Sequence, residues 1–203
     1  PKRLTAYVDV SKQFLIQDSA SAEEMLKRDI VNAISDKLEA TILGSAAGSA
    51  TMPAGIFNGV TAETKDITYK RLVDMETALE EANVAGNKCF IVSPSAKGIL
   101  KTTAKDALYN VTDGGVHTCV GCAGCLMEEN EVNGYPVYCT SNVTSKGVVM
   151  GHFEDFVIGQ WGGIDLTVDP YTQAANGKVR LVINAYFDAK PRRTGSFQKA
   201  ILK

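Results

Sequence analysis

The sequence predicts an α+β fold, and three observations support that class. Amphipathic helical patterns fill much of the first half of the chain, whereas the region from Val148 onward is rich in predicted strands. The apolar strand over residues 179–187 is long and lies far in sequence from its candidate partners, so its pairing must be non-local. Helices followed by a sheet with distant strand partners are typical of α+β proteins.

The first predicted elements are a strand and a long helix. Residues 3–10 alternate between apolar and polar side chains, which predicts a half-buried strand. Ser21 and Glu24 match a capping box, and Gly44 provides a C-cap, so we predict a helix over residues 21–43. Its apolar face comprises Leu26, Ile30, Ala33, Ile34, Leu38 and Ile42.

Residues 44–59 read as a connecting loop of small residues, because the glycine spacing matches no phosphate-binding motif. A second helix follows, with Thr68 as its N-cap and an apolar stripe of Leu72, Met75, Leu79 and Ala82. Residues 88–92 then predict a buried strand, and Ser93-Pro94 begins a third helix. Further strands are predicted over residues 135–140, 156–160, 164–168, 179–187 and 197–202.

The composition is ordinary for a globular protein, with 45% hydrophobic and 22% charged residues among 203, and it excludes a wholly disordered chain. The net charge of −2 predicts no strong attraction to nucleic acid or to an anionic membrane. We expect no secretory signal, because residues 1–10 carry charges and alternate instead of forming an apolar block. We expect no membrane span either, because the uncharged residues 40–62 are mostly small and contain Pro53. Since the first residue is Pro1, we expect a fragment or a trimmed chain.

Cysteine spacing gives the sharpest chemical signal. Cys119, Cys122 and Cys125 form two consecutive CxxC spacings, and His117 or Cys139 offers a fourth ligand for zinc or an iron–sulfur cluster. The alternative is a surface loop of reduced thiols, which the absence of a signal peptide favours. A second CxxC pair is missing, so we predict no bound metal. Cys89 lies within an apolar strand and is expected in the core.

Other polar groups favour a structural interpretation over a catalytic one. The chain has no Gly-x-Ser-x-Gly elbow, and no motif pairs His152 with a nucleophile. The acidic run of Glu128, Glu129 and Glu131 reads as a solvated loop rather than a cation site. The basic cluster of Lys190, Arg192 and Arg193, with Lys199 and Lys203 nearby, reads as a turn between strands rather than a phosphate site. We therefore predict a structural protein, not an enzyme, with no catalytic, cofactor-binding or metal-binding residue.

The resemblance of this sequence to a known family rests on the order of several segments rather than on any single motif. The relevant segments are residues 8–18, 53–58, 90–94, 133–138, 151–159 and 192–199, whose sequences run from VDVSKQFLIQD to RRTGSFQK. In order and spacing they resemble the major capsid proteins of tailed bacteriophages, which have the Hong Kong 97 fold. The resemblance extends over almost the whole chain.

The resemblance implies a shell subunit of a phage or prophage capsid with two interleaved domains. Residues 1–67 and 162–190 would form a peripheral domain containing the spine helix 21–43, and residues 68–161 and 191–203 an axial domain. The loop over residues 113–131 would lie near a fivefold or sixfold axis. Implied partners are further copies in pentamers and hexamers, together with scaffold, protease and portal proteins. The shell would enclose DNA without specific binding and would assemble in the bacterial host cytoplasm, without a membrane.

Two departures from the family and two alternatives accompany this interpretation. The family's N-terminal arm and extended loop are expected to be missing here. Isopeptide cross-linking has no support, since Asn176 and Asn184 near the long strand have no accompanying Glu. An encapsulin-type compartment shares the implied fold. A small cysteine-ligated metal or redox protein is the alternative from another class.

Overall fold

The computed structural model describes residues 1–17, 19–64, 66–105, 110–113, 116–119 and 124–203. It contains both helices and sheets, which confirms the α+β class. The chain forms two compact units. Unit 1 comprises Pro1–Ile42, Gly48–Ala54 and Ile158–Ala189, and unit 2 comprises Leu43–Ala47, Gly55–Val157 and Lys190–Lys203. Within these described ranges, no helix is both long enough and apolar enough to cross a membrane.

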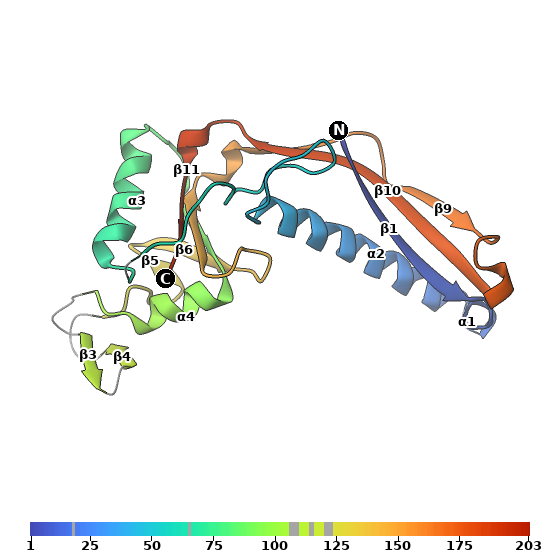
Figure 1. Cartoon of the computed structure of the whole chain (residues 1–203), viewed down its shortest axis with the longest axis horizontal. Helices are drawn as coiled ribbons and strands as arrows, with labels where there is room; N and C mark the ends of the chain where they lie inside the picture. Colours follow the sequence, from blue (N-terminus) through green and yellow to red (C-terminus); the bar gives the residue numbers. More distant parts are fainter. Residues whose placement is uncertain (18, 65, 106–109, 114–115, 120–123) are drawn as a thin grey trace. The chain divides into compact units, whose positions relative to one another are not determined.

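Unit 1 is built around the long strand β10 (Lys178–Pro191). Residues 180–184 of β10 pair on one side with β1 (Lys2–Ser11) and on the other with β9 (Asp165–Asp169), both antiparallel. Strand β8 (Phe156–Gln160) also pairs with β10. The pairing of β1 with β10 joins segments more than 160 residues apart, as in Lys2 opposite Phe187, and Figure 1 shows the two strands running side by side. This confirms the prediction of non-local pairing.

Helix α2 (Ser19–Ile42) packs along this sheet, after the short helix α1 (Lys12–Gln17). Its buried residues Ile30 and Ile34 meet Ile183 of β10, and four partly buried side chains complete the cluster, namely Leu4, Ala6, Val8 and Phe187. An amphipathic helix on the apolar face of a sheet forms the core of this unit.

The structure corrects three details of the predicted helix. The helix begins at Ser19, so Ser21 lies inside its first turn and the capping-box assignment is wrong. Ala33, expected on the apolar face, is exposed, and Leu38 is only half-buried. Both depart from the prediction because α2 meets the sheet along the line of Ile30 and Ile34 rather than across the whole apolar face. The helix α1 had no counterpart in the sequence analysis.

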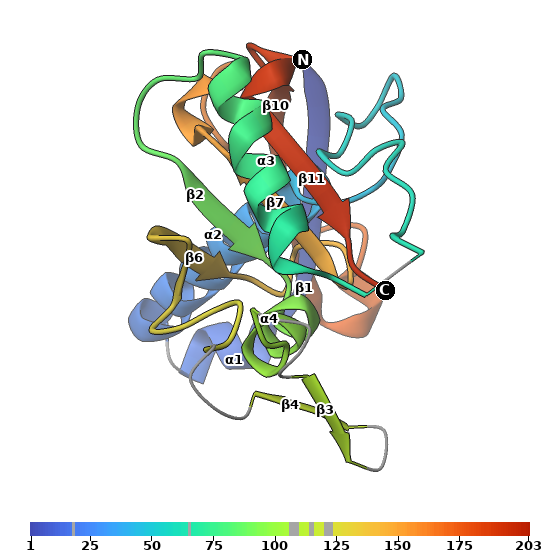
Figure 2. The ribbon, with the colours of Figure 1, turned by 90° about the vertical axis from the view of Figure 1, so that its left-hand side faces the viewer.

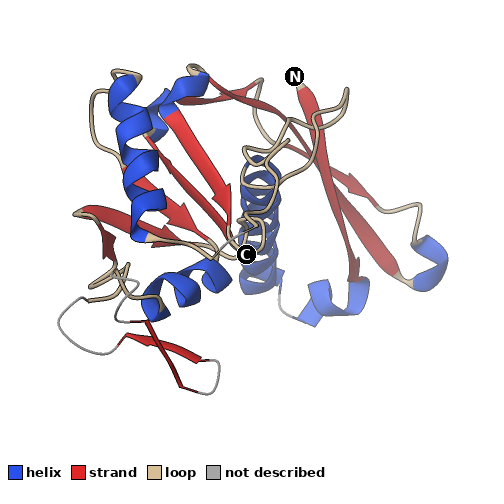
Figure 3. Cartoon of the chain, turned by 60° about the vertical axis from the view of Figure 1, so that its left-hand side comes forward, coloured by secondary structure: helices blue, strands red, loops and turns tan. Residues whose placement is uncertain are grey.

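Unit 2 contains a five-stranded sheet in the order β11-β7-β2-β6-β5. Its strands are β2 (Cys89–Val92), β5 (Glu131–Val132), β6 (Tyr135–Cys139), β7 (Gly147–Gly151) and β11 (Phe197–Ile201). Strands β2 and β6 are parallel, and the other described pairs are antiparallel. Helix α3 (Tyr69–Glu81) lies along the sheet, against β7 and β11, as Figures 2 and 3 show. Helix α4 (Pro94–Thr102) follows β2.

The helices of unit 2 form as their sequences predict. The Thr68 hydroxyl accepts a hydrogen bond from the backbone N–H of Arg71 and caps α3, and Ser93 caps α4 in the same way. The apolar stripe of α3 is almost fully buried at Leu72, Met75 and Leu79. These side chains join a core that includes Phe90, Val92, Leu100, Val132, Val148, Met150 and Leu202.

Two segments between these elements complete the chain. The hairpin of β3 (Asn110–Asp113) and β4 (Val116–Cys119) lies partly in the region expected to be a loop, over residues 113–131, and corrects that expectation. The β-branched residues Val111, Thr112, Val116 and Thr118 favour these short strands. Residues 44–59, all of which the structure describes, contain turns and bends but no helix or strand, as predicted. Short 3-10 helices occur at η2 (Phe153–Asp155), η3 (Ala174–Asn176) and η4 (Thr194–Ser196).

Candidate functional site

The cysteines of the described part of the chain lie on several different elements. Cys119 ends strand β4, with its backbone opposite Asn110, and Cys122 lies outside the described residues. Cys125 is disulfide-bonded, so the expectation of a reduced thiol is wrong there, and its backbone N–H donates to Glu128 Oε1 at 3.0 Å. Among the described residues, no three His, Cys, Asp or Glu side chains gather in a way that could hold a metal ion. The predicted lack of metal stays a prediction.

The other two described thiols lie on the sheet of unit 2. Cys89 in β2 is half-buried and free, and burial raises the pKa of its thiol because the thiolate is poorly solvated there. Cys139 at the end of β6 is free and exposed. His117 lies in β4, with its backbone opposite Thr112.

His152 has the structural role that the sequence favoured. Its Nδ1–H donates a hydrogen bond of 2.8 Å to the carbonyl oxygen of Asn87, which can only accept. The ring packs against Gly86, where a Cβ would lie only 2.6 Å from the imidazole carbon Cε1. Gly86 also has a φ of +95°, which L side chains rarely adopt. The imidazole therefore fastens the turn before β2 to the end of β7.

A nearby serine and aspartate do not complete a catalytic triad with this histidine. The buried Ser196 hydroxyl donates to Asp155 Oδ2 at 2.5 Å, and only the backbone N–H of His152 contacts Ser196, at its carbonyl oxygen. In a Ser-His-Asp triad the imidazole, not the carboxylate, accepts the proton of the serine hydroxyl. The arrangement fixes the turn before β11.

The acidic run forms a tight exposed turn. The backbones of Glu128 and Glu131 exchange two hydrogen bonds, at 3.1 and 2.7 Å, and Glu129 and Asn130 between them have positive φ. Glu128 lies 3.8 Å from Lys105 Nζ. All three glutamates are exposed, as expected of a solvated loop.

The basic cluster lies at the turn between β10 and β11, as the sequence predicts. Lys190, Arg192 and Arg193 are exposed there, Lys199 in β11 is half-buried, and Lys203 lies 3.7 Å from Asp66. The backbone N–H of Arg192 donates to the Asp155 carbonyl oxygen at 2.7 Å. Both asparagines considered for cross-linking form side-chain hydrogen bonds: Asn184 Oδ1 accepts from the Thr5 hydroxyl across the β1–β10 pair, and Asn176 Nδ2 donates to Gln173 Oε1.

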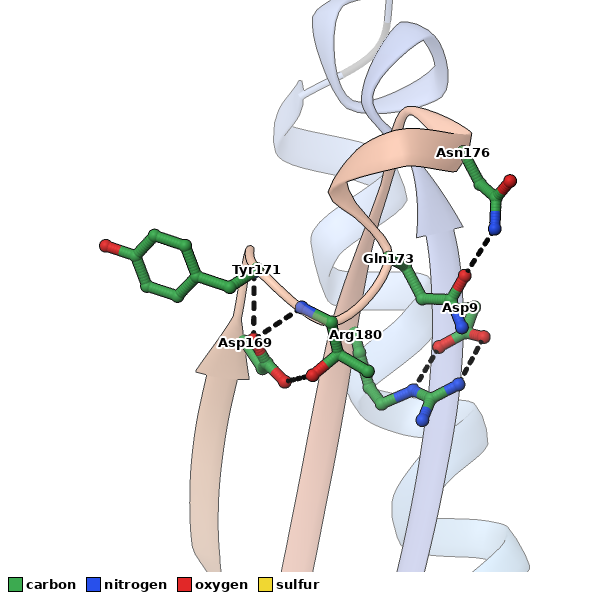
Figure 4. Close-up of polar contacts among 7 residues, drawn as sticks. Asp9, Asp169, Tyr171, Gln173, Asn176 and Arg180 are labelled. Atoms are coloured by element: carbon green, nitrogen blue, oxygen red, sulfur yellow. Dashed lines mark hydrogen bonds and ion pairs between the residues drawn. The ribbon is translucent and has the colours of Figure 1, made fainter.

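The β9–β10 turn of unit 1 carries the best-defined polar contacts (Figure 4). Arg180 donates two hydrogen bonds to the Asp9 carboxylate, at 2.6 and 2.8 Å. The guanidinium carbon Cζ of Arg180 lies 4.5 Å from the centroid of the Tyr7 ring. Asp169 accepts from the backbone N–H groups of Tyr171 and Thr172 and from the Thr172 hydroxyl. The pKa of Asp9 is lowered by the Arg180 hydrogen bonds, and that of Asp169 by the Thr172 hydroxyl first.

An apolar groove in unit 1 is the surface feature that sequence reasoning missed. It has a volume of about 440 Å³ and lies between α2 and the sheet. Its walls include Leu26 and Val31 of α2 and Leu166 and Val168 of β9. The alternation of residues 164–168 was a signal for one apolar strand face, but the sequence did not reveal that this face stays uncovered.

Comparison with known proteins identifies the family. The sequence profile of the phage capsid family matches residues 1–200. The chain is 26% identical over 206 residues to the major capsid protein of Halomonas phage phiHAP-1, covering 98% of this chain but 32% of that protein. The chain thus spans about a third of that curated relative.

Solved structures show the same fold. The capsid of an empty GTA particle matches with a TM-score of 0.70 and 16% identity, over 100% of this chain and 72% of that one. Gordonia phage Cozz matches at 0.66 and 14%, over 99% and 70%. The SrpI encapsulin of Synechococcus elongatus PCC 7942 matches at 0.64 and 12%, over 98% and 73%. The fold is therefore that of Hong Kong 97-like shell proteins. Because the family profile spans nearly the whole chain, this protein belongs to the phage capsid family.

Proposed function

We propose that the chain is a structural subunit of a phage or prophage capsid shell and has no catalytic role. The match of the capsid family to residues 1–200 carries the proposal. The contacts of His152, Ser196 and Asp155 support it, because these three side chains hold turns of unit 2 in place. The encapsulin alternative shares the fold alone, whereas sequence similarity favours a phage capsid protein.

We further propose that unit 1 is the peripheral domain and unit 2 the axial domain. The long helix α2 on the β1–β10 sheet supports the first assignment. Both units differ in extent from the sequence-based domains: residues 43–47, 55–67 and 190 belong to unit 2, and residues 158–161 belong to unit 1. In the shell, copies of the chain form pentamers and hexamers through contacts between different faces, which close into rings.

The remaining partners follow from the role of a shell wall. The chain would assemble in the bacterial cytoplasm with scaffold, protease and portal proteins and become part of the virion. A net charge of −2 suits a wall that encloses DNA without binding it tightly.

Expression of the complete gene tests the proposal. We expect closed particles by electron microscopy and light scattering, with the scaffold or protease supplied where neighbouring genes encode them. Nuclease-protected DNA in particles from an induced host separates a phage capsid from a compartment shell. A protein that never exceeds a dimer under these conditions would contradict the proposal.

A further inference from the structure

An asparagine followed by a glycine occurs at three places in the chain, at residues 58–59, 133–134 and 176–177. This dipeptide is the one most prone to lose its side-chain amide, because glycine has no Cβ to keep its own backbone nitrogen away from the asparagine side chain. The structure places the three pairs in different surroundings, and these surroundings decide where the reaction can proceed in the folded protein.

Loss of the amide sets three requirements on the structure. The backbone nitrogen of the glycine gives up its proton and attacks Cγ of the asparagine, which places negative charge on Oδ1. The bond between Cγ and Nδ2 then breaks, ammonia leaves after taking up that proton, and a five-membered succinimide remains. Water opens the ring at either carbonyl carbon and yields aspartate or isoaspartate. The glycine N–H must therefore be free, the amide must be free to rotate, and Oδ1 must be solvated.

The Asn58-Gly59 pair meets all three requirements. Asn58 is exposed, and among the residues that the structure describes neither its amide nor the N–H of Gly59 makes a hydrogen bond. The pair lies at the centre of a tight turn, in which the Val60 N–H donates to the Phe57 carbonyl oxygen at 3.1 Å. Gly59 has a φ of +74°, as in the third residue of a type II turn, and a Cβ on it would meet no atom within 4 Å. The space around the reacting atoms is therefore open.

The second asparagine, Asn133, does not meet the requirement for solvation. It is half-buried, and its Nδ2 donates to Glu76 Oε2 at 3.4 Å, while the Tyr135 hydroxyl donates to the other oxygen of that carboxylate at 3.0 Å. Its Oδ1 is buried and has no hydrogen-bond donor among the described residues. Negative charge on a buried oxygen without a donor is costly, so attack on this Cγ is disfavoured.

At the third pair both reacting groups are engaged. The Nδ2 of Asn176 donates to Gln173 Oε1 at 2.8 Å (Figure 4), and the N–H of Gly177 donates to the Ala174 carbonyl oxygen at 3.1 Å. The nitrogen that has to attack is therefore held in the turn, and its hydrogen bond must break first. Asn176 is as exposed in class as Asn58, so exposure alone does not distinguish the two.

We propose that Asn58 is the site at which the folded chain deamidates spontaneously, through attack of the Gly59 nitrogen, while Asn133 and Asn176 are protected. The inference goes beyond the proposed function, because the chemistry depends on the geometry of these three turns alone. Either product adds one negative charge to a chain of net charge −2.

The isoaspartate product has a further structural effect, because it adds one methylene to the backbone at position 58. The preceding residue, Phe57, is 0% exposed, and its N–H donates to the Gly44 carbonyl oxygen at 3.0 Å, within unit 2. A longer backbone next to this anchored side chain disturbs its packing. Accumulation of isoaspartate should therefore lower the melting temperature.

Peptide mapping of the aged protein tests the proposal, because trypsin places the three pairs on separate peptides, over residues 38–65, 106–146 and 147–178. The folded chain is kept at mildly alkaline pH, which favours removal of the amide proton, and conversion is followed by mass spectrometry. Each rate is divided by the rate in concentrated guanidinium chloride, where the fold no longer distinguishes the pairs. This ratio should be at least about tenfold higher for peptide 38–65, since a hydrogen bond that must break first adds about 1.4 kcal/mol to the barrier. Equal ratios, or a higher ratio for either other peptide, would overturn the proposal.

Two variants at position 58 separate the reaction from its consequence. Asn58→Gln keeps an amide but would have to close a less favourable six-membered ring, so peptide 38–65 should stay unconverted and the melting temperature should not fall with age. Asn58→Asp adds the charge without lengthening the backbone, so it should melt close to the fresh, unaltered protein. Conversion of Asn58→Gln at the unaltered rate would contradict the assigned site. An unchanged melting temperature of the fully converted protein would refute the effect on Phe57.

Discussion

Replacing Ile34 by alanine tests the packing of α2 on the sheet of unit 1. Ile34 is 4% exposed and packs with Ile30 and Ile183 in a small core. Truncation of a buried isoleucine to alanine typically lowers the free energy of unfolding by about 2–5 kcal/mol, because apolar contacts are lost and a cavity remains. The small core of unit 1 makes that a large fraction of the ~5–15 kcal/mol typical of a domain.

The expected shift can be measured with the chain's own fluorophore. Trp161, the single tryptophan, lies in unit 1, so its emission during urea unfolding reports that unit. With a loss of about 3 kcal/mol and a denaturant slope of about 1.5 kcal/mol/M, the midpoint falls by roughly 2 M urea. Far-ultraviolet circular dichroism follows both units together and reveals whether unit 2 unfolds separately.

Asp36→Ala is the matched control on the same helix, since Asp36 is exposed and its loss should change stability by no more than about 0.5 kcal/mol. Leu38→Ala should fall between the two, because Leu38 is half-buried. Equal midpoint shifts for Ile34→Ala and Asp36→Ala would refute the assignment of the buried face of α2.

Three further predictions concern turns, charges and metal. Gly98→Ala in the interior of α4 should stabilise the protein by about 0.5–1 kcal/mol, because the added Cβ meets no atom within 4 Å. Gly55→Ala should instead lower the melting temperature, because its Cβ would lie 2.1 Å from the carbonyl oxygen of Gly44. The pKa of Asp9 is lowered, so its ion pair with Arg180 stabilises the fold fully at pH values above the ordinary pKa of 3.8, and this stabilisation is lost as the pH falls through the lowered pKa. The Asp9→Asn variant should therefore unfold more easily at pH 7 and lose less stability in acid than the unaltered protein. An unchanged dependence of stability on acid pH would contradict this. Elemental analysis of anaerobically purified protein should find less than one zinc or iron per chain, and a stoichiometric metal would contradict the interpretation of the cysteines.

The elements that sequence reasoning predicted well are those whose signals are local. Helix α3 has its cap at Thr68 and its apolar stripe within one continuous segment, and both are present in the structure. The start of α2 was less predictable, because α1 and the residues before Ser21 also adopt helix without a distinctive stop signal. Strand β4 was missed because four residues carry too little periodicity to distinguish a strand from a loop.

Features that depend on distant pairing could not be predicted from the sequence in the same way. A strand was predicted over residues 164–168, but nothing local showed that β10 would separate it from β1. For the same reason, the exposure of Val168 and the half-burial of Leu38 emerged only from the structure. The resemblance to capsid proteins depended on the order of many segments, which is why no single residue marks the function.

Cryo-electron microscopy of particles that contain this chain tests the central proposal most directly. A reconstruction should show a closed icosahedral shell whose wall is made of this chain, with unit 2 around the fivefold and sixfold axes and unit 1 toward the periphery of each capsomer. Absence of this chain from the shell wall, or a complete protein that forms no closed particle with its neighbouring gene products, would contradict the assignment of this chain as a capsid subunit.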